Sequence, residues 1–304
     1  MKKNDEEKEK KKKYNEKLSY KMPSLNERDY RMLMVINDFV CIRAWDIAII
    51  AGFGSISYVN KRLLQFTRCG YIRSEYLQNE KIYTLTSKGK YAIGEDGSKA
   101  SQIFNFNSQT THYLYTARVA AIQFAKNPNM SYASIITDKR LKEYMAKQTA
   151  DNGVKLEHRP DIVIGFSAYE IELNYKKYAD LKANILNNSL AFQHQLWIVP
   201  KHLTTLREHI KKATKELGLN NVRVTTYERI AQEQDKFNVA EIAQTIMERD
   251  ETQRWNIDMI QRSHRPRQDG KQRNVDKYRK LPATIEQRQP PTSNERMRLF
   301  LNEE

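Results

Sequence analysis

Apolar residues recur at helical spacing three times in the first hundred positions, and two strand-like runs follow. Ser24 and Glu27 form a capping-box pattern at the start of the first helix. Gly52 follows the second helix as a stop signal, and Ser55 precedes the third as a cap. The expected helices cover residues 25–39, 45–51 and 56–68, and the expected strands cover residues 71–77 and 81–86.

Three helices followed by a β-hairpin is the order of a winged helix-turn-helix domain, which we expect over residues 22–95. Residues 57–68 would form its recognition helix and residues 76–82 its wing. The alternative is a winged helix that docks another protein and has an ordinary solvated basic face. The side chains expected to contact DNA are Ser57, Asn60, Lys61, Arg62, Gln65 and Arg68.

A second unit is predicted over residues 110–250, after a polar stretch at 96–109 that is typical of a linker. Thr110 or Thr111 is the expected cap of a helix that runs to Lys126. The elements expected after it are strands at 131–137, 159–166 and 168–175, a helix at 176–190, a strand at 195–199, a helix at 203–217 and a strand at 221–226. This order predicts a mixed sheet with helices on both faces, so the fold class is α/β, or α+β overall.

The net charge of the chain indicates the kind of partner it binds. The 304 residues contain 52 Lys and Arg against 37 Asp and Glu, a formal net charge of +15. Such an excess favours nucleic acid, because cations that neutralise phosphates release counterions. Residues 1–21 are predicted to be a disordered charged leader, and residues 251–304 a basic, polar tail.

Other features exclude whole classes of protein. Cys41 and Cys69 have neither a disulfide framework nor zinc spacing, so both are expected to be small buried hydrophobes. No apolar run is long enough for a membrane span, and no apolar segment follows the basic N-terminus. We therefore expect a cytoplasmic protein without membrane insertion. The absence of a His-x-His pair and of a phosphate-binding loop argues against histidine-cluster relaxases and ATPases.

The strongest candidate chemistry is a group of carboxylates on two consecutive predicted strands. Asp161 follows Arg159 and Pro160 at the start of one strand, and Glu170 and Glu172 share one face of the next. Clustered carboxylates repel each other unless a cation or raised pKa values relieve them. We expect the three to bind a divalent metal, Mg²⁺ or Mn²⁺, which can activate water and stabilise a departing oxygen. The alternative is a solvated sheet face.

The helix from His112, the three-stranded meander and the pattern Arg-Pro-Asp followed by Glu-Ile-Glu resemble the PD-(D/E)xK nuclease core. With the preceding winged helix, residues 25–230 are similar to the replication-relaxation proteins of Gram-positive plasmids and to MobC-type relaxases. The resemblance implies a restriction-endonuclease-like mixed sheet flanked by helices. It also implies that Asp161 and Glu172 are metal ligands and that Glu170 is a third.

The resemblance implies two further catalytic residues. His112 lies where that family has a helical histidine, and a neutral imidazole can exchange a proton near pH 7; the alternative is a rim residue. The motif requires Lys two residues after its second acid, where this chain has Glu172 or Asn174. Lys176 is the expected substitute and Lys177 the spare.

Three nearby residues are expected to have ordinary structural roles. Asp138, a further carboxylate candidate, is predicted to cap the following helix. His158 is predicted to be a surface turn residue, with contact to a backbone phosphate as the alternative. Tyr178, a candidate covalent nucleophile, is expected to pack between its helix and the sheet.

Two classes of function follow. The first is a divalent-metal relaxase that nicks one strand at a plasmid transfer or replication origin, working with a coupling protein or accessory relaxosome factor. The second is a catalytically inactive, sequence-specific regulator of plasmid replication or transfer, which the missing motif lysine favours. A third reading, within the enzyme class, is a restriction- or repair-type endonuclease.

Overall fold

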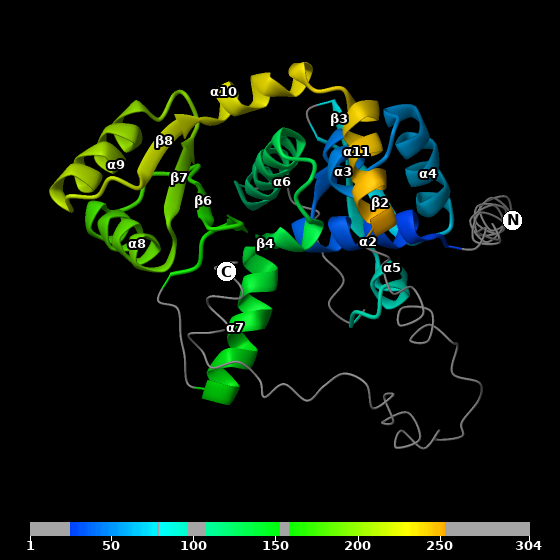
Figure 1. Cartoon of the computed structure of the whole chain (residues 1–304), viewed down its shortest axis with the longest axis horizontal. Helices are drawn as coiled ribbons and strands as arrows, with labels where there is room; N and C mark the ends of the chain where they lie inside the picture. Colours follow the sequence, from blue (N-terminus) through cyan, green and yellow to red (C-terminus); the bar gives the residue numbers. More distant parts are fainter. Residues whose placement is uncertain (1–24, 78, 97–107, 153–157, 253–304) are drawn as a thin grey trace, which may run out of the picture.

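A computed structural model describes residues 25–77, 79–96, 108–152 and 158–252 of the chain. Within these ranges the chain forms a three-stranded and a five-stranded sheet, both surrounded by helices (Figure 1). The predicted mixture of helices and strands is therefore confirmed. The predicted leader, linker and tail lie wholly or largely outside the described residues.

The N-terminal part has the predicted order of three helices and a hairpin. Its elements are α2 (Glu27–Phe39), β1 (Ile42–Arg43), α3 (Ala44–Ala51), α4 (Ile56–Arg68), β2 (Ile72–Leu77), β3 (Glu80–Leu85) and α5 (Ser87–Ala92). The sequence pattern missed the two-residue strand β1, which pairs antiparallel with β3. The first sheet therefore has the order β1-β3-β2.

The ends of these helices follow local signals, with one correction. Ser55 accepts a hydrogen bond from the Tyr58 amide and caps α4, and Gly52 ends α3 in the left-handed conformation, both as predicted. The predicted cap of the first helix is wrong. Asn26 caps α2, and Asp29 completes the capping box that had been assigned to Ser24 and Glu27.

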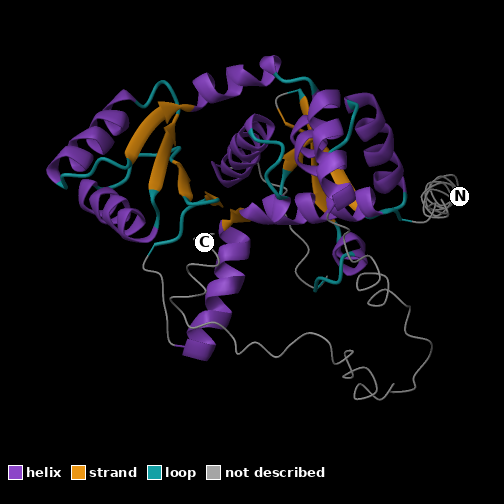
Figure 2. Ribbon diagram, in the orientation of Figure 1, coloured by secondary structure: helices purple, strands orange, loops and turns teal. Residues whose placement is uncertain are grey.

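The second sheet has the order β4-β5-β6-β7-β8 and begins with an antiparallel meander. The pairs β6–β7 and β7–β8 are parallel, so the sheet is mixed, as predicted (Figure 2). The elements are α6 (Ser108–Lys126), η2 (Tyr132–Ser134), β4 (Ile135–Thr137), α7 (Asp138–Asn152), β5 (Ile162–Ile164), β6 (Ser167–Ile171), α8 (Tyr178–Ala191), β7 (His194–Val199), α9 (Thr204–Glu216), β8 (Val222–Thr226), α10 (Tyr227–Ala231), η3 (Gln232–Lys236) and α11 (Val239–Thr252).

Several boundaries differ from the expected ones. Helix α6 begins at Ser108, so Thr110 and Thr111 lie inside it and are not its cap. The strands β5 and β6 are shorter than predicted, and Glu172 follows the end of β6. Helix α8 begins at Tyr178, which leaves Lys176 in the connection before it. Helix α7 occupies much of the stretch between the strands predicted at 131–137 and 159–166, and it extends away from the rest of the described chain (Figure 1).

Two hydrophobic clusters cover the two faces of the five-stranded sheet. The smaller one packs α8 and α9 against Trp197 and Val199 of β7. The larger one joins α6 and the opposite face of the sheet, including Ile171 and Ile198, to the N-terminal helices. Helices on both faces were predicted, and the clusters confirm them.

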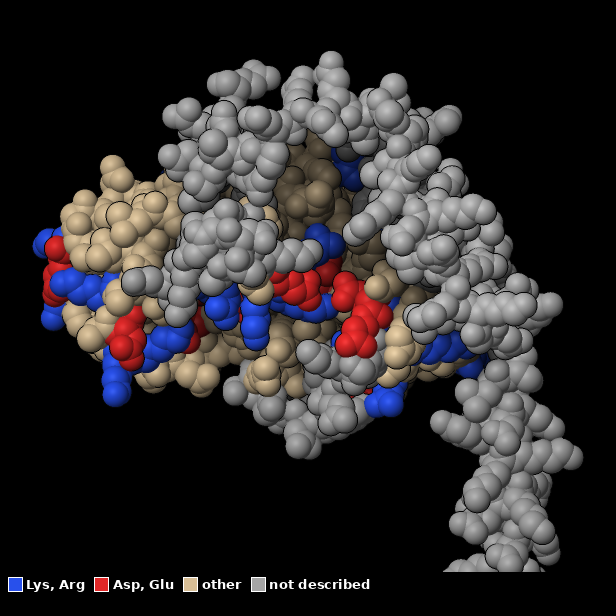
Figure 3. Space-filling model, turned by 90° about the horizontal axis from the view of Figure 1, so that it is seen from below, with Lys and Arg blue, Asp and Glu red and all other residues tan. Residues whose placement is uncertain are grey.

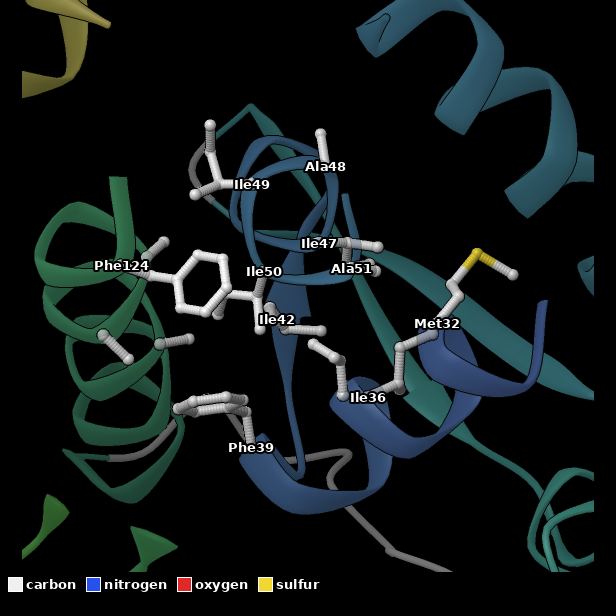
Figure 4. Close-up of a cluster of buried hydrophobic side chains, with 14 of the residues drawn as sticks. Met32, Ile36, Phe39, Ile42, Ile47, Ala48, Ile49, Ile50, Ala51 and Phe124 are labelled. Atoms are coloured by element: carbon white, nitrogen blue, oxygen red, sulfur yellow. The ribbon is translucent and has the colours of Figure 1, made fainter. Parts of the chain in front are cut away.

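The larger cluster extends across the predicted linker. Figure 4 shows Phe39 of α2, Ile50 of α3 and Phe124 of α6 directed into the same group of buried side chains. Helix α11 returns to pack against α3, where Ile246 lies over Gly52. The division at residues 96–109 stays a prediction, but side chains from both of its sides share one core.

Cys41 and Cys69 are both buried, as expected. Within the described residues, no helix is both long and apolar enough to cross a membrane.

Candidate functional site

The antiparallel pairing of β5 and β6 brings the predicted acids to one end of the five-stranded sheet. Asp161 lies just before β5, and its Oδ2 accepts a 2.7 Å hydrogen bond from the Ile171 amide at the end of β6. Glu172 follows at once, and its amide donates to the Ile198 carbonyl. These bonds hold the carboxylate of Asp161 and the backbone of Glu172 at the strand ends.

His112 approaches this sheet end from α6. Its Nε2 lies 3.1 Å from Asp161 Oδ1. Burial lowers the pKa of His112, but the hydrogen bond to Asp161 and the nearby charges of Glu172 and Glu170 outweigh burial, so the pKa is raised. The imidazole is thus held close to a carboxylate and biased toward the protonated form.

Lys176 reaches back to Glu172 from the connection between β6 and α8. The two side chains form an ion pair through Nζ and Oε2. Burial raises the pKa of Glu172, and the charge of Asp161 adds to this effect while Lys176 opposes it. The pKa of Lys176 is also raised, because the attraction of Glu172 exceeds the cost of burial. Each group therefore makes the ionised form of the other more favourable than it would be if that group were buried alone.

These side chains surround one pocket of about 200 Å³. Its lining residues are Gln109, His112, Asp161, Ile171, Glu172, Leu173, Asn174 and Lys176. Four of the five predicted catalytic residues are thus brought together. Figure 3 shows one face of the molecule, where acidic side chains lie among basic ones.

Glu170 is the predicted site residue that does not line the pocket. The residue is 3% exposed, and its Oε1 lies 2.6 Å from His158 Nε2. The side-chain amide of Asn188 on α8 donates to the same oxygen at 2.8 Å. Burial raises the pKa of Glu170, and the hydrogen bond from His158 opposes this.

His158 and Asn188 were not predicted as neighbours of the site. His158 was expected to be a surface turn residue, but its side chain is partly buried against Glu170. Its position just before Arg159 and Pro160 was a signal that it would lie near the carboxylates. Asn188 gave no such signal, because it lies in another element and nothing in its local sequence indicates which strand α8 covers.

Asp138 does not cap α7 as predicted, whereas Tyr178 has the packing that was expected. Thr137, rather than Asp138, accepts from the Arg140 amide in the first turn of α7, and Asp138 instead binds Arg159 at 2.9 Å. Tyr178 packs against the cluster of α8, β7 and α9, as expected, and is not among the residues that line the pocket.

The pocket offers two carboxylates and one imidazole as possible metal ligands. No group of three or more His, Cys, Asp or Glu side chains arranged to hold a metal is found among the described residues. Mg²⁺ commonly uses only one or two carboxylates and takes its other ligands from water and substrate phosphates. Asp161 and Glu172 are hard oxygen donors whose mutual repulsion a cation would relieve, so they fit such an ion.

The residues predicted to contact DNA divide into two groups. Ser57, Asn60, Lys61 and Arg68 are exposed on α4. The expectation that Arg62 belongs to the exposed face is wrong. Its guanidinium is buried, binds both carboxylate oxygens of Asp29 on α2 and donates to Gln65 Oε1 at 2.8 Å.

Exposed apolar and aromatic side chains also occur on α4 and β2. Leu64 is 42% exposed and follows Asn60 and Lys61 at helical spacing, so it shares their face of α4. Tyr76 of β2 is 69% exposed, with Lys81 Nζ 5.9 Å from its ring centroid. Leu64 was not among the side chains that the sequence predicted on this face.

Comparison with known proteins finds no relative: no protein-family profile, no curated protein and no solved structure matches the chain.

Proposed function

We propose that this chain is a divalent-metal-dependent DNA endonuclease that nicks one strand at a plasmid transfer or replication origin. One observation carries the proposal: Asp161, Glu172, His112 and Lys176 line the same pocket at the end of a mixed sheet. Two carboxylates, a proton-exchanging group and a cation are the set that metal-assisted phosphodiester hydrolysis needs.

Asp161 and Glu172 would hold Mg²⁺ or Mn²⁺. A bound divalent cation supplies positive charge that stabilises a departing oxygen and lowers the pKa of a ligated water. Glu170 binds His158 and Asn188 outside the pocket, so it is not a ligand in this arrangement. The expected set of three acidic ligands is thus reduced to two.

The remaining pocket residues have separate roles. Lys176 would hold the scissile phosphate, since an ammonium paired with Glu172 can exchange that partner for a phosphate oxygen. His112, held by Asp161, would give or take a proton at the reacting oxygen.

The exposed face of α4 would recognise the origin as part of a winged helix, with residues 76–82 as the wing. The polar and basic side chains available for this are Ser57, Asn60, Lys61 and Arg68. Arg62 has no part in recognition, because it is buried against Asp29. Lys61→Ala and Arg68→Ala should each weaken binding to origin DNA and reduce the dependence of affinity on salt concentration.

The test is a nicking assay on supercoiled plasmid that contains the DNA flanking the gene, in Mg²⁺, Mn²⁺ or EDTA. The expected product is open circles that require metal. Asp161→Asn and Glu172→Gln should abolish nicking while affinity for DNA persists. Glu208→Gln is the matched control, because Glu208 is an exposed carboxylate on α9. Equal nicking by all variants would show that Asp161 and Glu172 are not the catalytic residues. Linear product would indicate a restriction- or repair-type enzyme.

A second candidate is a sequence-specific regulator whose nuclease-like site is inactive. The observation that favours it is that Lys176 already pairs with Glu172 and that no lysine occupies the motif position. It predicts salt-sensitive binding to the origin with no open circles in any metal. Binding of that kind by the wild-type protein and by Asp161→Asn alike would establish the regulator.

A further inference from the structure

Strand β8 is the last strand of the five-stranded sheet, and no described strand pairs with its outer edge. The Asn221 carbonyl accepts from the Gln195 amide at 2.9 Å, and the register places Gln195 opposite Val222. In a parallel ladder the peptide groups of alternate residues point to opposite sides. The peptide groups of Val222 and Val224 therefore face away from β7 and are available to another extended segment.

A groove of about 360 Å³ lies beside this edge and is lined by residues of α9, β8 and the connection between them. Figure 1 shows α9 next to β8. Its lining residues are Ile210, Lys211, Thr214, Lys215, Leu219, Val222, Arg223 and Val224. Half of them are aliphatic, and three of the other four are cations. An extended segment that pairs with β8 would thus find an apolar floor for alternate side chains and a positively charged rim.

The charge of this rim is only partly neutralised. Lys211 pairs with Glu208 at 2.8 Å, whereas neither Lys215 nor Arg223 has an ion pair within the part of the chain that the structure describes. The groove therefore fits a segment that combines alternating apolar residues with acids. A second copy of β8 fits poorly, because it would bring its own Arg223 to the same edge.

The chain contains a segment of this kind in residues 297–304, with the sequence Met-Arg-Leu-Phe-Leu-Asn-Glu-Glu. In an extended conformation Met297, Leu299 and Leu301 would share one face. Glu303 and Glu304 follow after Asn302 and complement the basic rim. The 44 residues at 253–296 can span at most ~150 Å, so chain length does not prevent contact with β8.

We propose that residues 297–304 pair with the outer edge of β8 in the same molecule as a sixth strand, with their apolar face in the α9–β8 groove. The added strand supplies hydrogen-bond partners for the outward peptide groups of Val222 and Val224, which no described strand provides. It also gives Lys215 and Arg223 acidic partners and removes an open edge that would otherwise promote association between chains.

Hydrogen exchange of the backbone amides tests this pairing. We expect the amides of Val222 and Val224 to exchange at least tenfold more slowly in the full chain than in a chain that ends at residue 294. The double variant Leu299→Asp/Leu301→Asp keeps the length and should exchange like the shortened chain. Equal exchange in the full and shortened chains would overturn the proposal.

Charge-reversal variants test whether the acids of the segment lie next to the cations of the groove. Glu303→Lys/Glu304→Lys should lose protection, and adding Lys215→Glu/Arg223→Glu to it should restore protection. Failure of this restoration, with the groove variant folded, would contradict the charge pairing. Light scattering identifies the source of the strand: a monomer supports pairing within one chain, and a dimer that is lost on shortening would overturn it in favour of exchange between chains.

Discussion

Gly52 has a conformation and a neighbour that together exclude any side chain. Its φ is +73°, and a Cβ at this position would lie 2.9 Å from Ile246 Cγ2 of α11. Gly218 has a similar φ of +66°, but no heavy atom lies within 4 Å of its Cβ position. Substitutions at these two glycines therefore distinguish the cost of backbone strain alone from the cost of strain combined with steric overlap.

We predict that Gly218→Ala lowers the free energy of unfolding by about 1 kcal/mol, the cost of left-handed backbone with a side chain. Gly52→Ala should cost at least about 2 kcal/mol, because overpacking against Ile246 adds to the strain. Denaturant unfolding of both variants measures the difference. Equal losses would show that α11 moves aside without cost.

The pKa of His112 gives a second prediction at this scale. Its raised value in the folded chain means that the folded state binds the proton more tightly than the unfolded state does. This stabilisation is fully present below the unfolded pKa of about 6.5 and is lost as the pH rises through the folded pKa.

NMR titration in EDTA should therefore show a His112 pKa above the usual value, and Asp161→Asn should lower it. The free energy of unfolding should fall as the pH rises through that range, and it should fall less in Asp161→Asn. Glu208→Gln serves as the control and should leave the pKa of His112 unchanged. An unshifted pKa in the wild-type protein would contradict the contact between His112 and Asp161.

At the scale of elements, Arg62 and Asp29 connect α4 to α2. Asp29 also completes the capping box of α2, so one carboxylate serves both the start of a helix and its contact with the next. Removing one partner of a buried ion pair leaves the other charge without compensation. The position and orientation of α4 thus depend on a side chain that had been assigned to DNA contact.

We predict that Arg62→Met lowers the free energy of unfolding by about 3 kcal/mol. The affinity of the remaining folded protein for DNA should stay unchanged. Arg68→Ala, an exposed residue of the same helix, should change stability by less than about 0.5 kcal/mol and weaken binding. Thermal unfolding and fluorescence anisotropy with origin DNA measure the two quantities. If Arg62→Met instead weakened DNA binding with little loss of stability, Arg62 would belong to the DNA-contacting face.

At the scale of the whole molecule, the larger hydrophobic cluster joins the N-terminal helices to α6, to the five-stranded sheet and to α11. Asp46 of α3 and Arg118 of α6 form a buried ion pair across the same contact. Parts that share a core lose its stabilisation together when either part unfolds.

We therefore predict a single cooperative unfolding transition. Trp45 lies in the N-terminal part and Trp197 lies in the sheet, so single-tryptophan variants that retain one or the other report on each part separately. Their denaturation midpoints should coincide, and Phe124→Ala should lower both by the same amount, with a loss of about 3–5 kcal/mol. Two separate midpoints would establish residues 96–109 as a boundary between independent domains.

Local sequence was sufficient for the identity and order of most elements. Ser55 and Gly52 mark helix ends by chemistry within one turn, and the alternation of β6 places Glu170 and Ile171 on opposite faces whatever surrounds them. Asp161 and the acids after it were predicted to meet because they lie on consecutive strands with a tight turn between them. Such features depend on neighbours a few residues away.

Tertiary structure decided which partner each side chain has. Arg62 looked like a surface cation until Asp29 bound it, and Glu170 looked like a metal ligand until His158 and Asn188 enclosed it. A periodic pattern shows which face of an element is apolar or charged, but it does not show which other face will cover it. The contact between α3 and α6 has the same origin: each helix encodes a buried surface, and only packing determines that the two surfaces meet.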